Sequence, residues 1–335
     1  MPVNLSRIKL WSIGGGKGGI GKSLITLGLG VALARLGKKV ILIDGDLGGA
    51  NLHTLMGIRY PHVTLDHFLA KKVERLEDIV IETVVEGIGL ICGADDLLGA
   101  ANPTYAQKIR LLNQIEELPA QYVLMDLGAG TSFNTLDIFN YSAGKITLFT
   151  SQATSLQNAY GFIKSALYRK LSRDFAKDDE VLHLLYQGGE AETENSVNSI
   201  QDLLTHFKDT NSEQYARLTQ ALNDFHLFLV VNMVKSHADL KSPEIIQSVC
   251  RDFLNIKTDI MGQVSFDSGV EAAIRKMVPF PLHQKKSKAM KGLDQIALSV
   301  VKESRLPRLT REEVWEASEE EDLSMDTIIT HPTGS

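Results

Sequence analysis

The chain has 335 residues, of which 44% are hydrophobic and 23% charged, and its formal net charge is -6 at pH 7. This length and composition suit one large α/β domain that has an insertion and a sizeable apolar core. The acidic balance argues against a protein that binds polyanions over its whole surface, although it is compatible with one basic face.

Cysteine usage and hydropathy exclude further classes of protein. The cysteines are Cys92 and Cys250, which form no CxxC pair, so a disulfide framework, a zinc finger or a cysteine-ligated cluster has almost no ligands. We expect both to be buried small hydrophobic residues in a reducing cytosol. The N-terminus lacks the apolar stretch of a signal peptide, and no segment reaches the roughly 20 apolar residues that span a bilayer. These features predict a soluble, cytoplasmic protein.

Short apolar runs alternate along the chain with longer segments of helical periodicity. The runs are rich in Val, Ile and Leu and are bounded by Gly or Asp, which is typical of strands buried on both faces of a mostly parallel sheet. They cover residues 8–13, 40–43, 88–91, 122–125, 146–149 and 228–231. Helical periodicity covers residues 22–36, 105–117, 156–171 and 243–254. The alternation predicts a doubly wound α/β fold.

Two segments depart from this alternation. Residues 172–223 are polar and helix-prone without a clear strand, and they are longer than the usual connection between a helix and a strand. We expect a helical insertion there, within one domain over residues 1–304. Residues 305–335 are rich in Glu and end in Pro332-Thr333-Gly334-Ser335, a composition that favours a flexible acidic tail.

The segment after the first predicted strand carries the strongest functional signal. It matches the pattern G-x-x-x-x-G-K-S/T directly before a predicted helix, as Gly16-Lys17-Gly18-Gly19-Ile20-Gly21-Lys22-Ser23. Its glycines let backbone N–H groups turn inward around phosphates, next to the positive end of the helix. In such a P-loop, Lys22 reaches the terminal phosphates and Ser23 binds Mg²⁺. A glycine-rich turn without function would not require Lys and Ser at this spacing.

Acidic residues end two other predicted strands. Asp44 and Asp46 follow the second strand, and Asp126 ends the strand over residues 122–125. Acids at strand ends are often turn residues, but this is also the edge at which α/β sheets bind ligands. Asp126 has the Walker B arrangement, which suits indirect Mg²⁺ binding. The glycines at positions 128 and 130 are expected in a switch II loop that responds to the γ-phosphate.

Lys17, a second lysine early in the loop, makes the chain resemble the deviant Walker A family of P-loop ATPases. This SIMIBI-type family includes MinD, ParA, the flagellar-number regulator FlhG, the Mrp scaffold proteins and the nitrogenase iron protein. The resemblance extends over about residues 8–299 apart from the insertion. It includes D-x-D followed by N-L at residues 44–52 and D-x-x-A-G at residues 126–130. It implies ATP and Mg²⁺ as cofactors and a homodimer that forms when ATP is bound.

The resemblance also implies roles for the charged residues. Lys17 would cross the dimer interface to the nucleotide of the other subunit, and Asp46 would orient the attacking water. Asp44 would support the Mg²⁺ shell, to which Ser23 and Asp126 also contribute. Lys17, Lys22 and Asp46 are therefore the catalytic candidates.

The resemblance also gives roles to two asparagines, and the chain differs from the family pattern in one segment. By resemblance, Asn51 would help to hold switch I, and Asn232 would read the adenine edge and favour ATP over GTP. Where the last segment of the family usually begins with Ile-Pro, this chain has Val264-Ser265-Phe266-Asp267. We therefore expect the adenine pocket to differ in detail.

The absence of certain residues and segments excludes several branches of the family. The cysteines cannot hold the cluster that the iron protein and Mrp-type carriers share between subunits. The acidic tail lacks the basic amphipathic helix through which MinD binds membranes, so no autonomous membrane binding is expected. Residues 1–6 are too short for the activator segment that FlhG members often carry. The first choice is an FlhG-like or orphan MinD-like positioning ATPase, for flagellum placement or number or for the division site, with an unidentified activating protein partner.

Two alternatives remain. A ParA-like partition ATPase would bind DNA non-specifically, for which the lysines of Lys285-Lys286-Ser287-Lys288-Ala289-Met290-Lys291 could contact phosphates. A lysine cluster is more often a solvated helix face, so DNA binding is not favoured. An ATP-dependent amidoligase of the same superfamily is disfavoured because no additional constellation for a small substrate is evident.

Overall fold

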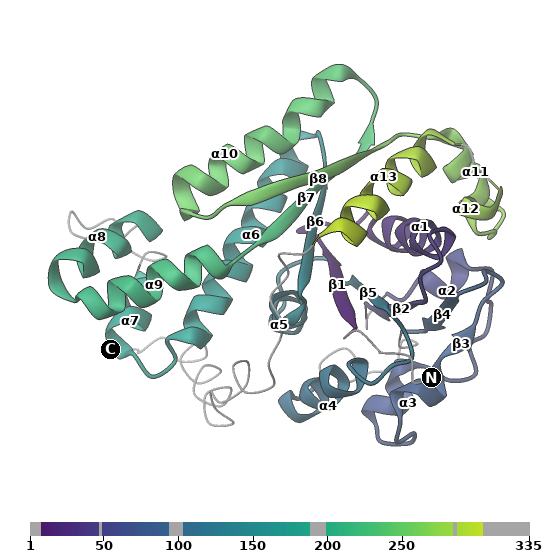
Figure 1. Ribbon diagram of the computed structural model, residues 1–335, viewed down its shortest axis with the longest axis horizontal. Helices are drawn as coiled ribbons and strands as arrows, with labels where there is room; N and C mark the ends of the chain where they lie inside the picture. Colours follow the sequence, from purple (N-terminus) through teal and green to yellow (C-terminus); the bar gives the residue numbers. More distant parts are fainter. Residues whose placement is uncertain (1–7, 47–48, 94–102, 188–198, 284–286, 304–335) are drawn as a thin grey trace, which may run out of the picture.

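The computed structural model describes residues 8–46, 49–93, 103–187, 199–283 and 287–303. An eight-stranded sheet with the order β3-β4-β2-β5-β1-β6-β7-β8 lies at its centre (Figure 1). Neighbouring strands are parallel except for β3 and β4, which are antiparallel. The strands are β1 (Lys9–Gly14), β2 (Val40–Gly45), β3 (Ile81–Glu82), β4 (Ile88–Ile91), β5 (Tyr122–Leu127), β6 (Gly144–Thr150), β7 (Leu227–Val234) and β8 (Thr258–Ser265).

The central strands are buried on both faces, which explains their continuous apolar runs. Along β2, Ile41 and Ile43 point into one hydrophobic core, and Leu42 points into the core on the other face. The first core is covered by the helices and 3-10 turns α3 (Leu65–Leu69), η1 (Leu76–Ile79), α4 (Tyr105–Ile115), α5 (Phe133–Tyr141), α6 (Ala153–Asp174) and α10 (Ser242–Leu254). The second is covered by α1 (Lys22–Arg35), α2 (Leu52–Leu55), α11 (Ser268–Arg275), α12 (Phe280–His283) and α13 (Lys288–Lys302).

The predicted strands and helices therefore occur, and the structure adds two strands. β3 forms a two-residue antiparallel edge, and β8 closes the opposite edge beside β7. The short turn η2 (His237–Lys241) follows β7.

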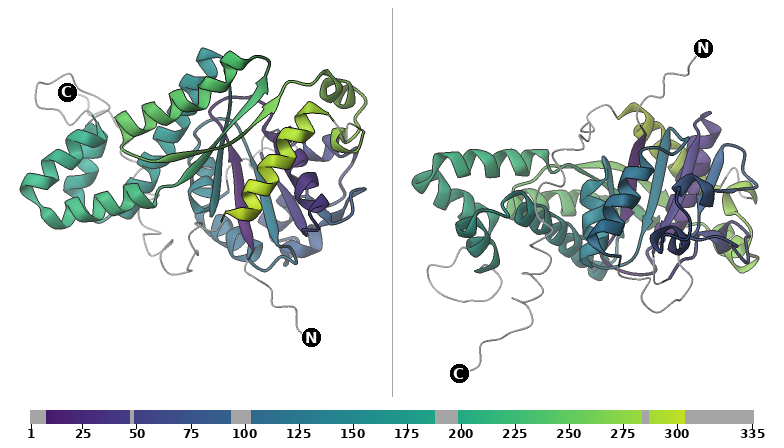
Figure 2. Two further views of the ribbon diagram at one scale, coloured as in Figure 1. Left: turned by 45° about the horizontal axis from the view of Figure 1, so that its top comes forward. Right: turned by 90° about the horizontal axis from the view of Figure 1, so that it is seen from below.

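The segment assigned to an insertion is helical where the structure describes it. It contains α7 (Asp179–Gln187), α8 (Ile200–Thr210) and α9 (Ser212–Asp224). Ser199 and Asn211 cap α8 and α9 by accepting hydrogen bonds from the backbone N–H groups of Asp202 and Gln214. The apolar faces of these helices join the core that α6 and α10 cover. They extend from one end of the molecule, opposite the end formed by α2, α11 and α12 (Figures 1 and 2).

A buried ion-pair network connects three helices on the same face. Asp137 on α5 is 3% exposed, and its carboxylate lies 2.8 Å from Lys108 Nζ on α4. The same carboxylate accepts hydrogen bonds from Arg169 and Arg173 on α6 at 2.8 and 3.0 Å. Burial acts to raise the pKa of Asp137, but the three cations outweigh it and hold the pKa below its ordinary value. Because Arg173 is near the end of α6, the network ties that end of the helix to α5.

Candidate functional site

Glycines determine the shape of the loop between β1 and α1. Gly21 has a φ of 93°, in the left-handed region that favours glycine. Gly16 lies against α6, where a Cβ would be 2.1 Å from the carbonyl oxygen of Asn158. Ile20 is buried and anchors the loop, whereas Lys17, Gly18 and Gly19 are exposed. The loop leads directly into the N-terminus of the 14-residue α1, an end at which anions bind favourably.

Lys22 and Ser23 open α1 directly beside Asp126 at the end of β5. Burial lowers the pKa of Lys22, and the carboxylates of Asp126 and Asp46 act against this shift. Burial and the neighbouring Asp44 raise the pKa of Asp126 to about 8, while a hydrogen bond from Ser23 and the charge of Lys22 oppose the rise. The predicted P-loop and Walker B residues thus come together at one edge of the sheet.

Asp44 organises the backbone that leaves β2. One carboxylate oxygen accepts the N–H of Asp46 at 3.2 Å, and the other accepts the N–H groups of Asn51 and Leu52, both at 2.9 Å. Burial raises the pKa of Asp44 to about 6, and these backbone donors limit the rise. The side-chain amide of Asn51 also donates to the carbonyl oxygen of Gly49 at 2.5 Å. Asp44 and Asn51 thus form a closed turn at the segment predicted to be switch I.

Asp46 lies between the two predicted switch segments. A Cβ on Gly128 would be 3.3 Å from one of its carboxylate oxygens, and a Cβ on Gly49 would be 3.6 Å away. Its charge also influences the pKa values of Lys22 and Asp126. The backbone N–H of Gly130 donates to the carbonyl oxygen of Gly15 at 3.4 Å, so the glycine segment after β5 reaches the P-loop. The carboxylate of Asp46 is therefore next to the loop that would hold the terminal phosphate.

Asn232 contacts the P-loop from the end of β7. Its side-chain amide donates a hydrogen bond of 2.8 Å to the carbonyl oxygen of Ile20. A Cβ on Gly21 would lie 2.5 Å from the same amide nitrogen, so a larger residue would not fit there. An amide nitrogen carries two hydrogens, so the second remains available to an acceptor such as a ring nitrogen of a base. N7 is an acceptor in adenine and in guanine, so such a contact alone would not separate ATP from GTP.

One residue of the site was missed by sequence reasoning. The hydroxyl of Thr26, one turn after Lys22 on α1, lies 3.0 Å from the carbonyl oxygen of Lys22 and 3.5 Å from Asp126 Oδ1. Thr26 is fully buried, and its hydroxyl lies next to the Asp126 carboxylate. In the sequence, the signal for Thr26 was its position three residues after Ser23, close to one turn along the predicted helix.

The donor atoms fit a magnesium ion that is bound together with a nucleotide. Within the described residues, no group of three or more His, Cys, Asp or Glu side chains could hold a metal ion. Mg²⁺ keeps several waters and is commonly bound through one or two protein oxygens plus substrate phosphates. The hydroxyl of Ser23 and the buried carboxylate of Asp126 supply such a pair.

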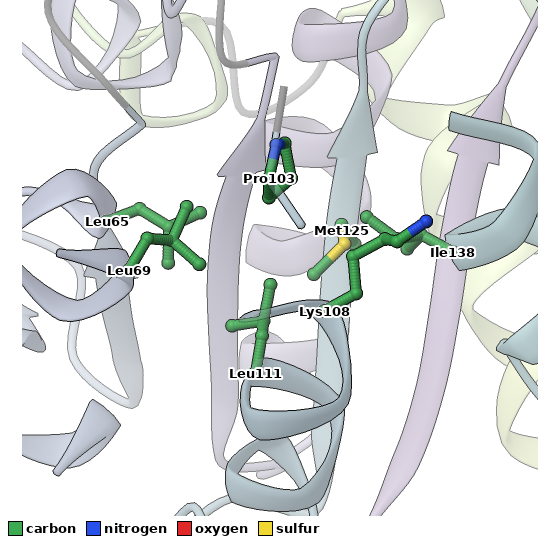
Figure 3. Close-up of a pocket in the computed structure, with 8 residues that line it drawn as sticks. Leu65, Leu69, Pro103, Lys108, Leu111, Met125 and Ile138 are labelled. Atoms are coloured by element: carbon green, nitrogen blue, oxygen red, sulfur yellow. The ribbon is translucent and has the colours of Figure 1, made fainter. Parts of the chain in front are cut away.

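A small apolar cavity lies behind this edge of the sheet. Its lining comes from β2, α3, α4, β5 and α5, together with Pro103 (Figure 3). Lys108 contributes its aliphatic stem, and its ammonium extends toward Ile138 on α5 (Figure 3). The volume of about 10 Å³ corresponds to about one water molecule. This cavity therefore does not serve as the nucleotide site.

Other expectations can be compared with the structure. Cys92 and Cys250 are both buried, as expected for small hydrophobic residues. No helix in the described ranges is long and apolar enough to cross a bilayer. Lys288 and Lys291 are exposed on α13, whereas Lys285, Lys286 and the acidic segment 305–335 lie outside the described residues.

Comparison with protein families identifies one match that spans most of the chain. Residues 11–280 match the family described as CobQ/CobB/MinD/ParA nucleotide binding domain. This range includes the P-loop, Asp44, Asp46, Asp126 and Asn232.

Three curated relatives have names that bear on function. The chain is 33% identical over 165 residues to an uncharacterised ATP-binding protein of Methanocaldococcus jannaschii, covering 49% of this chain and 60% of that protein. It is 27% identical over 159 residues to the antiactivator FleN of Pseudomonas aeruginosa, covering 47% and 56%. It is 31% identical over 166 residues to the flagellum site-determining protein YlxH of Helicobacter pylori, covering 48% and 54%. The chain therefore spans little more than half of the length of these relatives.

Solved structures share the fold at low sequence identity. MinD from Pyrococcus horikoshii in complex with Mg-ADP aligns with a TM-score of 0.60 at 20% identity, covering 88% of this chain and 96% of that one. The MinC:MinD complex of Aquifex aeolicus gives 0.58 at 19% identity, covering 90% and 98%. These alignments confirm the predicted α/β, mostly parallel P-loop fold.

Proposed function

Because the chain belongs to the CobQ/CobB/MinD/ParA family of nucleotide-binding domains, we propose that it binds Mg-ATP, hydrolyses it slowly and dimerises in the ATP-bound state. The observation that carries this proposal is the convergence of Lys22, Asp126 and Asp46 at the P-loop, with Lys17 exposed on its outer side. Phosphoryl transfer requires charge compensation, a metal and a positioned water, and these residues offer groups for each.

Each residue has a separate task in this proposal. The P-loop backbone and Lys22 bind the phosphates. Ser23 and Asp126 hold Mg²⁺, which neutralises charge on the phosphates, and Asp44 supports them through the turn that it organises. Asp46 orients water, since its carboxylate lies beside Gly128 at the predicted switch II. Lys17 reaches the nucleotide of a second subunit.

We place this switch in the cytoplasm, in a spatial positioning process. Relatives of the chain are named for flagellum site determination, septum site determination and antiactivation. A slow ATPase suits such a role because the lifetime of its ATP-bound state can time an assembly. An activating protein partner, still to be identified, would set the hydrolysis rate.

Non-specific DNA binding is the second candidate function, and it is supported by the exposed Lys288 and Lys291 at the start of α13. If these lysines contact phosphates, a Lys288→Ala, Lys291→Ala variant should bind DNA more weakly and with a shallower salt dependence. Fluorescence anisotropy with labelled duplex DNA measures both. Absence of ATP-dependent DNA binding by the wild-type protein removes this candidate.

Calorimetry and turnover measurements on two variants test the proposed function. Lys22→Ala should lose ATP binding because the charge that faces the terminal phosphates is gone. Asp46→Ala should retain ATP binding but turn over at least about 10-fold more slowly, because it removes water placement and leaves the phosphate cradle intact. Wild-type ATP affinity in Lys22→Ala, or wild-type turnover in Asp46→Ala, would contradict the assignment.

A further inference from the structure

One end of the molecule carries exposed cations next to exposed apolar side chains. A Cβ on Gly57, in the turn after α2, would lie 3.3 Å from the carbonyl oxygen of Met277, just after α11. The ends of these two helices are therefore in contact, on the side of the sheet that α1 also covers. We define the cationic apolar surface by the exposed residues of the two segments, Arg59, Tyr60, Ile274, Arg275, Lys276 and Met277.

The apolar members of this surface are unusually accessible for their size. Tyr60 is 83% exposed, and Ile274 and Met277 are 38% and 39% exposed. They stand beside three cations, and Glu271 is the acidic residue of α11. A nucleic-acid backbone would satisfy the cations alone, whereas an acidic segment that contains large apolar residues would satisfy both kinds of side chain.

The segment that contains Arg275 and Lys276 is basic, whereas the chain as a whole is acidic. Residues 272–293 contain no Asp or Glu, although the chain has a net charge of -6. The compensating acids are concentrated elsewhere. Residues 312–326 contain no Lys or Arg, and they include Glu312, Glu313, Glu316, Glu319, Glu320, Glu321, Asp322 and Asp326. The same segment carries Trp315, Leu323 and Met325.

We propose that residues 312–326 dock onto the cationic apolar surface of the same chain. The acidic side chains pair with Arg59, Arg275 and Lys276, and the apolar residues of the segment contact Tyr60, Ile274 and Met277. The contact requires no nucleotide, so it is independent of the proposed ATPase function. Because α2 begins directly after Asn51, the docked segment lies beside the segment that leaves the nucleotide site.

Tethering makes such a contact feasible even if each pair is weak. The described part of the chain ends just after α13, where Lys9 Nζ donates to the carbonyl oxygen of Glu303 at 3.3 Å. Eight residues lie between Glu303 and Glu312, and a connection of this length can span at most roughly 30 Å. Two sites on one chain meet at an effective concentration in the millimolar range when a short connection can span them. Exposed ion pairs are screened by salt, so the docked state should open as the ionic strength rises.

Acrylamide quenching of tryptophan fluorescence tests the proposal on the full chain. The chain has two tryptophans, and Trp11 is fully buried, so the quenchable emission reports on Trp315. At low salt, Trp315 should be shielded in the wild-type protein. In an Arg275→Glu, Lys276→Glu variant, quenching at low salt should match that of the wild type at about 1 M NaCl, where the Debye length is about 3 Å.

The matched control is a Lys71→Glu, Lys72→Glu variant, which makes the same change in charge at two adjacent exposed lysines. These lysines follow α3, on the opposite face of the sheet. Its quenching should equal that of the wild type. Equal quenching in the wild-type and Arg275→Glu, Lys276→Glu proteins would overturn the proposal.

Zero-length cross-linking with a carbodiimide identifies the occupant of the surface. Mass spectrometry should find amides between Lys276 and glutamates of residues 312–321. In a mixture of isotope-labelled and unlabelled protein, these links should join residues of one copy. Links between different copies would assign the surface to a second molecule and overturn docking within one chain. Sedimentation of the wild-type protein, but not of the Arg275→Glu, Lys276→Glu protein, with vesicles of anionic phospholipid would assign the surface to lipid and overturn the proposal equally.

Discussion

The side-chain amide of Asn232 at the end of β7 donates a hydrogen bond of 2.8 Å to the carbonyl oxygen of Ile20 in the P-loop. This contact connects residues that are 212 positions apart in the sequence. It ties the strand that faces the expected base to the loop that faces the expected phosphates. The hydrogen bond thereby holds the end of β7 against the P-loop.

We expect Asn232→Ala to weaken ATP binding because it leaves the buried carbonyl oxygen of Ile20 without its donor and releases the loop. A lost partner of this kind costs about 1 to 3 kcal/mol, which corresponds to a rise in Kd of roughly 5- to 150-fold. Calorimetric titration with Mg-ATP provides the measurement. Asn140→Ala is the matched control, because the Asn140 amide donates to the carbonyl oxygen of Ala166 at 2.9 Å between α5 and α6. An unchanged Kd in Asn232→Ala would show that the contact does not shape the site.

Lys145 on β6 provides a prediction about stability. Its ammonium is buried and donates to the carbonyl oxygen of Ser142 at 2.7 Å. Burial, with a contribution from Lys170, lowers the pKa of Lys145 to about 7. Below about pH 7 the folded state must bury a charged ammonium, so the free energy of unfolding is lowered by the full cost of this burial. Between pH 7 and 10.5 the folded chain loses this proton more readily than the unfolded chain, so the cost decreases as the pH rises. Its full size is on the order of 3 to 5 kcal/mol.

We therefore expect Lys145→Met to raise the free energy of unfolding at pH 7 and to have a smaller effect at alkaline pH. Urea denaturation at both pH values measures this difference. Lys177→Met, at an exposed lysine, controls for the general effect of removing a positive charge. A gain that does not change with pH would mean that the protonation of Lys145 is not its source.

The Asp137 network predicts a large loss of stability from a small change. Asp137→Asn should lower the free energy of unfolding by about 3 to 5 kcal/mol, because three cations lose their shared buried carboxylate. Thermal and urea unfolding provide the measurement. Asp174→Asn, which removes the more exposed partner of Lys170 on α6, should cost no more than about 1 kcal/mol. Similar losses for both variants would argue against the network as a special source of stability.

Membrane binding provides a further prediction. The acidic composition of residues 312–326 disfavours contact with anionic lipid because like charges repel at its surface. The full chain should therefore remain in the supernatant when it is sedimented with anionic vesicles, with or without ATP. ATP-dependent pelleting would instead support membrane anchoring in the manner of MinD.

Strands that are buried on both faces were predictable because they form continuous apolar runs. β8 was missed because it is an edge strand in which only Thr258 and Val264 are buried. Its other residues, which include Asp259 and Gln263, are exposed or half-buried. The two residues of β3 are too few to produce a pattern.

The P-loop was predictable because its glycines and Lys22 lie in one continuous motif. The contacts that complete the site join distant segments, as with Asn232 and Ile20, or Thr26 and Asp126. The spacing of residues along the sequence does not predict such contacts, because they depend on how distant segments pack. Asp44 shows the same limit, because its three backbone donors depend on the turn that the chain makes after β2.

Light scattering of the Asp46→Ala protein with Mg-ATP, beside the Lys17→Ala, Asp46→Ala protein, tests the central claim most directly. Slow hydrolysis should hold the single variant in the ATP-bound state, and its mass should be about twice that of the monomer, as expected for a two-fold dimer. The double variant should bind ATP and remain a monomer, because it lacks the cation that reaches the second nucleotide. A monomeric single variant, or a dimer that persists without Lys17, would contradict the proposed switch.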